Sequence, residues 1–316
     1  MPGVASRTAV QRAVDEFDVR TFQLKTEPAA LEAARESLDQ SGLLLLGEVH
    51  GVRQNALAIR ALMADLDVTG LALEWPAELA TAVSQFMADG KVPDHPLLWG
   101  GDGRITAGHF AVLRERFNAG QLTALTLFDG VNEVGWSRRE AAMADRILDA
   151  VQESGARRTL VVAGNAHTAL SATGLGVPLG ARLAERRPGV REVRIWYGNG
   201  SYYNLTPQRF KRQWTLRHDP RLRVEGEALI LDLPSPIQAR VPHRTQTGSQ
   251  PVLRTGGQPV LVTGAQQALR TGGQPVLPES PGWPVQRTPP LTVVQGEPAP
   301  RRQGSRRPSK AERTAR

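Results

Sequence analysis

Four short apolar runs, each ending abruptly in polar residues, constrain the fold of this 316-residue chain more than any other feature. The runs cover residues 43–46, 70–73, 122–128 and 159–163. Continuous apolar runs of this length, bounded by glycine or proline, are typical of strands that are buried on both faces, as in parallel sheets. We therefore expect these four segments to form strands of one parallel sheet.

Stretches with helical spacing separate the runs. In residues 56–66 the apolar side chains recur at intervals of three and four, which places them on one helix face. Residues 77–89 and 137–154 have the same spacing, and we expect Ser137 to cap the latter helix, with Glu140 completing a capping box. Alternating strands and helices predict an α/β fold, with a central, mainly parallel sheet and helices on both faces.

The polar residues after the four runs form the candidate site. Parallel strands place their carboxyl ends at the same edge of a sheet, and open α/β sheets bind ligands at that edge. Glycines at positions 47 and 51 would let the backbone turn sharply and let a ligand come close. We expect one crevice to gather Glu48 and His50 after the first run, Glu74 after the second, Asp129 after the third, and Asn165 and His167 after the fourth.

Four further segments have less certain roles in the domain. Residues 90–110 are rich in proline and glycine, and they could form either a lid over the crevice or an ordinary long connection. Residues 190–196 and 227–232 have the apolar character of strands. We expect residues 197–204, which continue the first of these strands, to close the edge of the sheet.

The last quarter of the chain differs in composition from the rest. Residues 241–316 hold 12 of the 23 prolines and 9 of the 31 glycines, and an octapeptide repeat beginning Thr-Gly occupies residues 247–278. Such a composition, with few residues able to form a core, is typical of disorder, and the repeat is too short for a solenoid unit. The sequence therefore predicts an α/β domain at residues 1–240 and a disordered, basic tail at residues 241–316.

Charge changes at the same boundary. The tail holds 11 of the 39 Lys and Arg residues and 3 of the 31 Asp and Glu residues, so the whole formal charge of +8 lies there and residues 1–240 are neutral. The tail could contact an acidic partner, and a remote hypothesis makes it the functional part of the protein, with the domain as an anchor. Nucleic-acid binding is not expected, because no motif of a nucleic-acid-binding fold accompanies the charge.

Several classes of protein and site are excluded by what the sequence lacks. The absence of cysteine excludes disulfides, thiolate zinc sites and a cysteine nucleophile. Residues 1–20 have no apolar core of a signal peptide, and no run approaches the roughly 20 apolar residues of a membrane span. We therefore expect a cytoplasmic protein without a membrane span.

Four motifs lie in fixed order at residues 47–50, 72–76, 139–144 and 163–167, and together they resemble those of the superfamily of ChaN-like haem-binding proteins, erythromycin esterases and TraB/Tiki proteins. Gly-Glu-x-His follows one strand, a second strand ends in Glu, and a late strand ends in Gly-Asn-x-His; the similarity covers about residues 35–200 and looks most like the ChaN-like branch. The further histidines that ChaN-like members often carry after the first motif are absent from residues 52–55. The matching segments are 47–50, 72–76, 139–144, 163–167, 176–179 and 182–183.

The resemblance and the chemistry of these side chains together suggest a hydrolase of ester or amide bonds. A neutral His50, oriented by Glu48 or Glu74, would remove a proton from water. His167 would bind or protonate the leaving group, and Arg139 would offset the charge of the oxyanion. We expect the catalytic residues to be Glu48, His50, Glu74 and His167, and the substrate-binding residues to be Arg139, Asn165 and Asp129.

The alternative is a non-catalytic metal-binding or haem-binding protein on the same scaffold, whose partner would be haem rather than a small-molecule substrate. Mixed nitrogen and oxygen ligands suit zinc, manganese or iron. Haem would take a histidine or a tyrosine as axial ligand, and tyrosines stand at positions 197, 202 and 203. The expected metal ligands are Glu48, His50, Glu74 and His167.

Simpler roles are also open to some of these residues. Asp129, followed by Gly130, is typical of a helix N-cap or a turn, and Arg139 could pair with a carboxylate on the surface. The remaining histidines are expected in the solvent or in the core, and they are His95, His109, His218 and His243.

Overall fold

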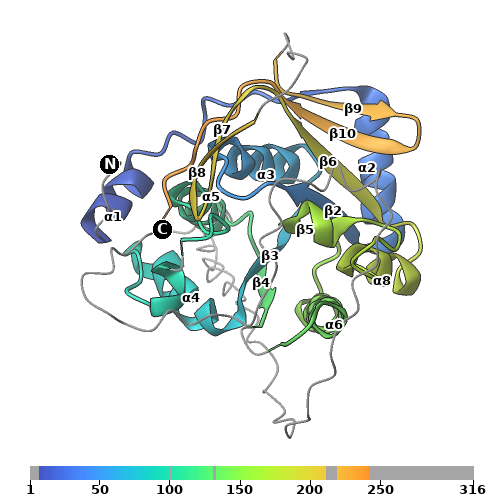
Figure 1. The fold of residues 1–316 in the computed structure, drawn as a ribbon, viewed down its shortest axis with the longest axis horizontal. Helices are drawn as coiled ribbons and strands as arrows, with labels where there is room; N and C mark the ends of the chain where they lie inside the picture. Colours follow the sequence, from blue (N-terminus) through green and yellow to red (C-terminus); the bar gives the residue numbers. More distant parts are fainter. Residues whose placement is uncertain (1–6, 100, 131–132, 211–218, 242–316) are drawn as a thin grey trace, which may run out of the picture.

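The computed structural model describes residues 7–99, 101–130, 133–210 and 219–241 of the chain. An eight-stranded sheet with the order β1-β9-β10-β6-β2-β5-β3-β4 forms its centre, and helices cover both faces (Figure 1). The predicted α/β class is confirmed. The predicted tail lies outside the described residues from position 242 onward.

Six neighbouring strands of the sheet run parallel to one another. Every residue of the four at the β4 end of the sheet is buried, as expected of strands that are covered on both faces. The carboxyl ends of these four strands therefore lie side by side at one edge. The six strands are β2 (Leu43–Glu48), β3 (Gly70–Pro76), β4 (Ala124–Asp129), β5 (Thr159–Gly164), β6 (Arg191–Tyr197) and β10 (Ala228–Leu233).

The far side of the sheet departs from the parallel pattern. There β9 (Arg221–Glu225) runs antiparallel to β10, and β1 (Lys25–Thr26) pairs with β9. The expectation that residues 197–204 close the sheet edge is wrong, since β7 (Gly200–Asn204) and β8 (Thr206–Phe210) form a separate hairpin. The chain leaves the sheet at position 198, where a Cβ would lie 2.0 Å from the carbonyl oxygen of residue 234.

Two cores, one on each face, attach the helices to the sheet. Because side chains alternate along a strand, Leu44 and Leu46 of β2 belong to the first core and Leu43 and Leu45 to the second. The first core holds α1 to α5, and the second holds α6 and α8 on the opposite face (Figure 1). The helices are α1 (Arg7–Asp15), α2 (Pro28–Ser41), α3 (Arg53–Asp65), α4 (Ala80–Asp89), α5 (Ala107–Asn118), α6 (Trp136–Ser154), α7 (Asn165–Thr168) and α8 (Leu179–Arg186), with 3₁₀ turns at Ala77–Leu79 and Pro96–Trp99.

Helix α6 begins one residue before the predicted start, and its predicted capping box is wrong. Gly135, with φ of 86°, occupies the N-cap position, and no side chain caps the helix. Ser137 lies inside the first turn, where its Oγ accepts a hydrogen bond from Arg182 at 3.2 Å. Glu140 is fully buried and points away from the helix start. Its carboxylate instead contacts His167 in the site described below.

The 90–110 segment is partly helical. It contains a 3₁₀ turn at Pro96–Trp99 and the first residues of α5, a helix that the apolar spacing did not predict. Thr106 caps α5, because its Oγ1 accepts a hydrogen bond from the backbone N–H of His109 at 3.3 Å. Residues 90–95 and 101–105 lie outside any helix or strand, and the second of these loops lies beside the strand ends.

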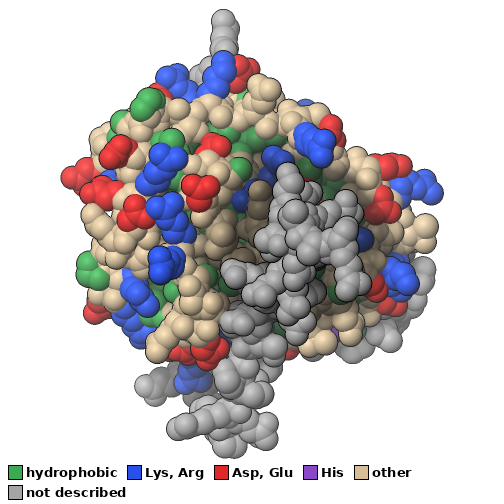
Figure 2. All heavy atoms as spheres, turned by 180° about the vertical axis from the view of Figure 1, so that it is seen from behind, with side chains coloured by type: hydrophobic (Ala, Val, Ile, Leu, Met, Phe, Trp, Pro, Cys, Tyr) green, Lys and Arg blue, Asp and Glu red, His purple; other side chains and the backbone are tan. Residues whose placement is uncertain are grey.

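The surface of the domain reflects its balanced charge. Figure 2 shows acidic and basic side chains interspersed over one face, as expected from the equal numbers of each in residues 1–240. Across the described ranges, no helix combines the length and the apolar character that a membrane span needs.

Candidate active site

The first part of the site is built where β2 ends. Glu48 is the last residue of the strand and is buried, and the side chain of His50, two residues later, is 21% exposed. His50 Nδ1 lies 3.2 Å from Glu48 Oε1. Glycine is needed at position 47, since a Cβ there would lie 2.5 Å from Oγ1 of Thr168. The strand thus delivers a buried carboxylate and a partly exposed imidazole as one hydrogen-bonded pair.

Glu74 of β3 lies at the centre of the site. Its Oε1 accepts a hydrogen bond from Arg139 Nη2 at 2.7 Å, and its Oε2 accepts one from the backbone N–H of Gly164 at 2.8 Å. His50 Nε2 lies 3.9 Å from Oε2, and His167 Nε2 lies 3.5 Å from Oε1. Because both imidazoles flank the same carboxylate, whose oxygens are little more than ~2 Å apart, their Nε2 atoms are separated by no more than about 10 Å.

Two arginines join Glu74 to the carboxylate at the end of β4. Arg139 donates from Nε and Nη2 to the two oxygens of Asp129, at 2.8 and 3.0 Å, in the bidentate geometry that suits a guanidinium and a carboxylate. Arg104 Nη1 contacts the same Asp129 carboxylate and lies 3.5 Å from Glu74 Oε1. Arg104 Nε also donates to Asp102 at 2.6 Å. The arginines therefore hold three carboxylates in one network.

His167 lies in α7, directly after β5, and both of its ring nitrogens are engaged. Nδ1 lies 2.6 Å from Glu140 Oε1, and Glu140 Oε2 accepts a hydrogen bond from the backbone N–H of Leu179 at 2.7 Å. Nε2 lies 3.2 Å from Arg139 Nη1. A guanidinium only donates, so this contact is a hydrogen bond when Nε2 keeps its lone pair. The geometry therefore assigns the ring proton to Nδ1.

The surrounding charges shift the pKa values of the central groups. Burial alone lowers the pKa of His50, but the hydrogen bond to Glu48 and the charge of Glu74 outweigh it, so the pKa lies above 6.5. Burial alone raises the pKa of Glu74, but the positive charges of His167 (when protonated), Arg139 and His50 hold it well below its usual value. Glu74 is therefore ionised at neutral pH.

Six of the seven residues predicted for the site belong to this network. The exception is Asn165, whose Oδ1 lies 3.0 Å from the Cβ position of Gly47 and which makes no side-chain hydrogen bond within the described ranges. Asp129 caps no described helix but binds the two arginines. Arg139 pairs with buried carboxylates rather than with one on the surface.

Four residues of the network were not predicted as site residues. Asp102 and Arg104 come from the 101–105 loop. The glycines at positions 101 and 103, which adopt positive φ, are the feature of the sequence that could have pointed to this loop. Glu140 stood in a matching motif but was assigned to a helix cap. The ring of Trp136 stacks on that of His167, with centroids 4.8 Å apart and planes inclined by 15°. Each reaches the site from a segment outside the four strand ends.

The four predicted metal ligands do not fit a metal centre. In the described part of the chain, no group of three or more His, Asp or Glu side chains is arranged to hold a metal ion. The guanidinium of Arg139 stands in hydrogen-bond contact with both Glu74 and His167, and Glu140 engages the other nitrogen of that imidazole. A metal ion on these residues would have to displace a buried positive charge.

Two of the tyrosines considered as haem ligands are engaged in the core. The Tyr197 hydroxyl accepts a hydrogen bond from the backbone N–H of Val49 at 2.9 Å and donates to Asn55 Oδ1 at 3.0 Å. Tyr202 is 2% exposed and packs against Phe210. Neither fits the role of an axial ligand without rearrangement of the fold.

The other described histidines agree with the expected core or solvent roles. His109 is buried against Trp75, and burial lowers its pKa. His95 is partly exposed, and its Nδ1 accepts a hydrogen bond from the backbone N–H of Leu97. His218 and His243 lie outside the described residues.

The fold is similar to solved structures at low sequence identity. A succinoglycan biosynthesis protein matches with a TM-score of 0.51 at 10% identity, over 75% of this chain and 99% of that chain. A Bacillus cereus protein gives a TM-score of 0.44 at 8% identity, over 75% and 99% of the two chains, and the type III effector HopBA1 gives 0.39 at 14%, over 67% and 97%. No protein-family model and no curated protein matches the chain. The chain shares the overall fold of the succinoglycan biosynthesis protein.

Proposed function

We propose that the protein is a hydrolase of ester or amide bonds in which His50 is the general base. One observation carries this proposal. Glu48 holds Nδ1 of His50, while Nε2 lies 3.9 Å from Glu74, its nearest carboxylate, and has no hydrogen-bond partner in the described residues. Since the side chain is 21% exposed, Nε2 is positioned to receive a proton from a water molecule.

The reaction follows from the two states of this imidazole. Neutral His50 takes a proton from water as the water oxygen bonds to the carbonyl carbon, and Glu48 stabilises the resulting imidazolium. The tetrahedral intermediate then expels the alcohol or amine, which takes the proton back from Nε2 as its bond to carbon breaks. A base in this position accelerates such a reaction by roughly 10²–10⁴-fold.

The roles of the other predicted residues change in light of their contacts. Arg104 suits the oxyanion better than Arg139, because its Nη2 has no partner in the described residues, whereas Arg139 is engaged by three side chains. His167 carries its proton on Nδ1, bonded to Glu140, so it suits binding rather than protonation of the leaving group. In the proposal, the leaving alcohol or amine therefore takes its proton from His50.

Substitution of the base tests the proposal. Hydrolysis of 4-nitrophenyl acetate by the full chain should fall by roughly 10²–10⁴-fold in His50→Gln. His95→Gln is the matched control, because His95 is also partly exposed but lies outside the network. Equal loss in both variants, or full activity in His50→Gln with an unchanged Tm, would contradict the assignment of the base.

A metal-dependent form of the same reaction is the second candidate, and it would require the contacts of Arg139 with Glu74 and His167 to rearrange. Glu48 Oε2 is buried and has no hydrogen-bond partner within the described ranges, and a carboxylate oxygen in that position could accept a cation. The metal-free proposal predicts that treatment with EDTA leaves hydrolysis by the full chain unchanged. Loss of activity on chelation, restored by zinc or manganese, would instead establish the second candidate.

A further inference from the structure

Exposed apolar side chains gather beside the candidate active site. Six large hydrophobic residues are exposed in the described part of the chain, and four of them flank the start of α6 and the loop between α7 and α8. We call these four the apolar rim. They are Val134, Leu170, Leu175 and Val177, with exposed fractions of 73%, 37%, 42% and 41%. Clustered exposure of this kind marks a binding surface more often than scattered exposure does.

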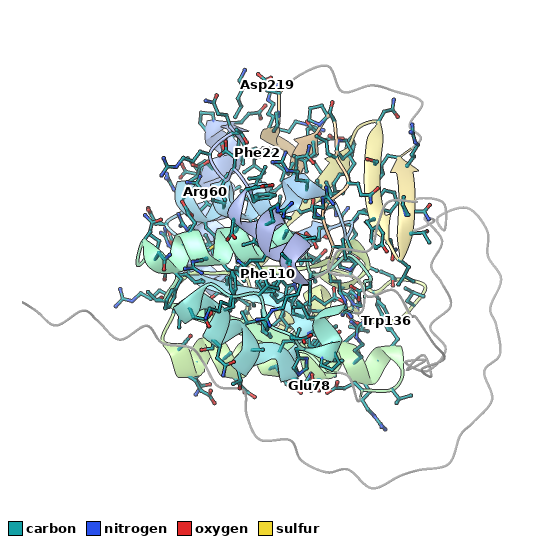
Figure 3. The ribbon with its side chains drawn as sticks, turned by 90° about the vertical axis from the view of Figure 1, so that its left-hand side faces the viewer. Phe22, Arg60, Glu78, Phe110, Trp136 and Asp219 are labelled. Carbon is teal, nitrogen blue, oxygen red and sulfur yellow. The ribbon has the colours of Figure 1, made fainter. Side chains whose placement is uncertain are left out.

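The rim adjoins the site through Trp136. Its ring stacks on His167, and a Cβ at position 176 would lie 3.5 Å from Cδ1 of the same ring. Leu175 and Val177 therefore stand on either side of the residue that covers Trp136. In Figure 3, Trp136 lies toward the edge of the fold, whereas Phe110 lies in its interior. The loop that carries Leu175 and Val177 thus lies beside an aromatic ring that stacks on His167.

The loop between α7 and α8, which carries three of the four rim residues, has a defined structure. Thr173 and Gly176 exchange backbone hydrogen bonds of 2.9 and 3.0 Å, which close a tight turn with Leu175 at its tip. Arg182 ties this loop to α6, since it donates to the carbonyl oxygen of Val177 at 3.3 Å and to Ser137 Oγ at 3.2 Å. These bonds hold the backbone that carries Leu175 and Val177 close to α6.

We propose that the rim binds an apolar acyl or alkyl group of the substrate while the scissile bond lies at His50. This inference rests on the proposed hydrolase function. Glu74 is shared by both imidazoles, so the rim continues directly into the site. A stable protein–protein interface buries about 800 Å² on each partner, more than four partly exposed side chains supply, whereas one hydrocarbon chain needs only a patch of this size. The substrate class is thus an ester or amide with an extended apolar group.

A comparison of acyl chain lengths tests the rim. For the full chain, kcat/KM should be higher for 4-nitrophenyl hexanoate than for the acetate. The double variant Leu175→Ser/Val177→Ser should lower that ratio about tenfold, mainly through KM, and leave acetate hydrolysis unchanged. The matched control is Leu205→Ser/Ile237→Ser, which removes the two exposed hydrophobic residues outside the rim. An unchanged ratio in the rim variant, or an equal fall in the control, would overturn the inference.

A binding measurement separates the rim from the catalytic proposal. Equilibrium dialysis with two ethers that cannot be hydrolysed, 1-hexyloxy-4-nitrobenzene and 4-nitroanisole, should show tighter binding of the hexyl compound and loss of that preference in the rim variant. This result would support binding of an alkyl group by the rim even if neither ester were hydrolysed. Equal binding of the two ethers, or a change in the oligomeric mass of the rim variant, would overturn it, the latter by assigning the rim to a second copy of the chain.

Discussion

The two arginines of the candidate active site differ in how many of their N–H groups are engaged. Arg139 directs Nε and Nη2 to Asp129 and Glu74, and Nη1 to His167, which occupies four of its five N–H groups. Arg104 directs only Nε and Nη1 to carboxylates of the described residues. Arg139 therefore acts as a positioning residue, and Arg104 retains donors for an oxyanion.

Substitution of Arg104 should test this difference. Arg104→Lys keeps the charge but removes the planar group with its parallel donors, so kcat/KM for an ester should fall by roughly 10²–10³-fold with little effect on KM. Arg158→Lys is a matched control, because Arg158 also pairs with a carboxylate, Asp39, near the opposite end of β5. Equal activity in wild type and Arg104→Lys would exclude Arg104 from the chemistry.

Sequence reasoning succeeded for residues whose position in a strand fixes their surroundings. Glu48 and Glu74 lie near the carboxyl ends of buried strands, so their approximate location followed from the apolar runs alone. The sequence-based prediction was wrong for Glu140. A glutamate three residues after a serine at a helix start satisfies the capping pattern whichever way its side chain points. Arg104 had no periodic signal, because it lies in a loop whose path depends on tertiary contacts.

At the level of elements, four segments meet beside His50, and one of them is the segment after β10 that contains Ala239. Gly51 donates its backbone N–H to the carbonyl oxygen of Gly103 at 2.9 Å and accepts hydrogen bonds from the backbone N–H groups of Tyr203 and Ala239, at 3.1 and 2.8 Å. The loop after β2, the loop that carries Arg104, the β7–β8 hairpin and the segment after β10 are therefore held together at one residue. The hairpin thus supports the site without contributing a side chain to its described hydrogen-bond network.

Loss of the glycine at this junction should weaken both fold and site. At Gly51 the φ is 73°, and a Cβ would lie 1.9 Å from the carbonyl oxygen of Tyr203, so Gly51→Ala should cost at least about 2 kcal/mol of unfolding free energy. Gly120→Ala provides the control, because its φ of 67° is similar but nothing lies within 4 Å of the new Cβ, and it should cost about 1 kcal/mol. Urea unfolding of both variants measures the difference; equal costs would show that the junction is not tightly packed.

The elements that could be predicted were those with strong periodicity. The four apolar runs became β2, β3, β4 and β5, with ends that differ from the prediction by at most three residues. Helix α5 was missed because its buried face includes His109 and Arg116, which interrupt the apolar spacing. The β7–β8 hairpin was misassigned because its strands pair only with each other and not with the main sheet. The chain leaves the main sheet at Gly198, where it passes close to the backbone of Pro234.

On the scale of the whole molecule, ionisation of the site is coupled to folding. The pKa of Glu74 in the folded protein lies well below its value of 4.5 in an unfolded chain. A carboxyl group of this kind contributes stability that is present above the unfolded pKa and is lost as the pH falls toward the folded one. Since Glu74 joins the ends of three strands, its protonation should weaken the centre of the sheet.

This coupling predicts a specific change in acid stability. The unfolding free energy of wild type should fall between pH 6 and pH 3.5, and Glu74→Gln should make that fall smaller by about 1 kcal/mol. Glu78→Gln is the control, because Glu78 is exposed nearby on the same connection (Figure 3). Urea unfolding at the two pH values gives the comparison. If Glu74→Gln left the fall in unfolding free energy between the two pH values unchanged, ionisation of Glu74 would not contribute to the stability of the fold.

The class and direction of the sheet followed from the sequence, but the order of its strands did not. Alternating strands and helices imply parallel crossovers wherever the strands lie, so the common edge was predictable. The placement of β5 between β2 and β3, which brings His167 to Glu74, depends on how the two helix layers pack. The antiparallel β9 left no distinct signal, because most of its residues are polar and only Leu222 is fully buried.

The most direct test of His50 as the base is the pH dependence of kcat/KM for ester hydrolysis. Because Glu48 helps to hold the pKa of His50 above 6.5, activity should rise with pH along a single limb that reports this pKa. Replacement of the hydrogen-bonded carboxylate in Glu48→Gln should move that limb to lower pH, since the imidazolium loses its nearest stabilising charge. A limb that stays in place in Glu48→Gln, or that persists in His50→Gln, would contradict the account.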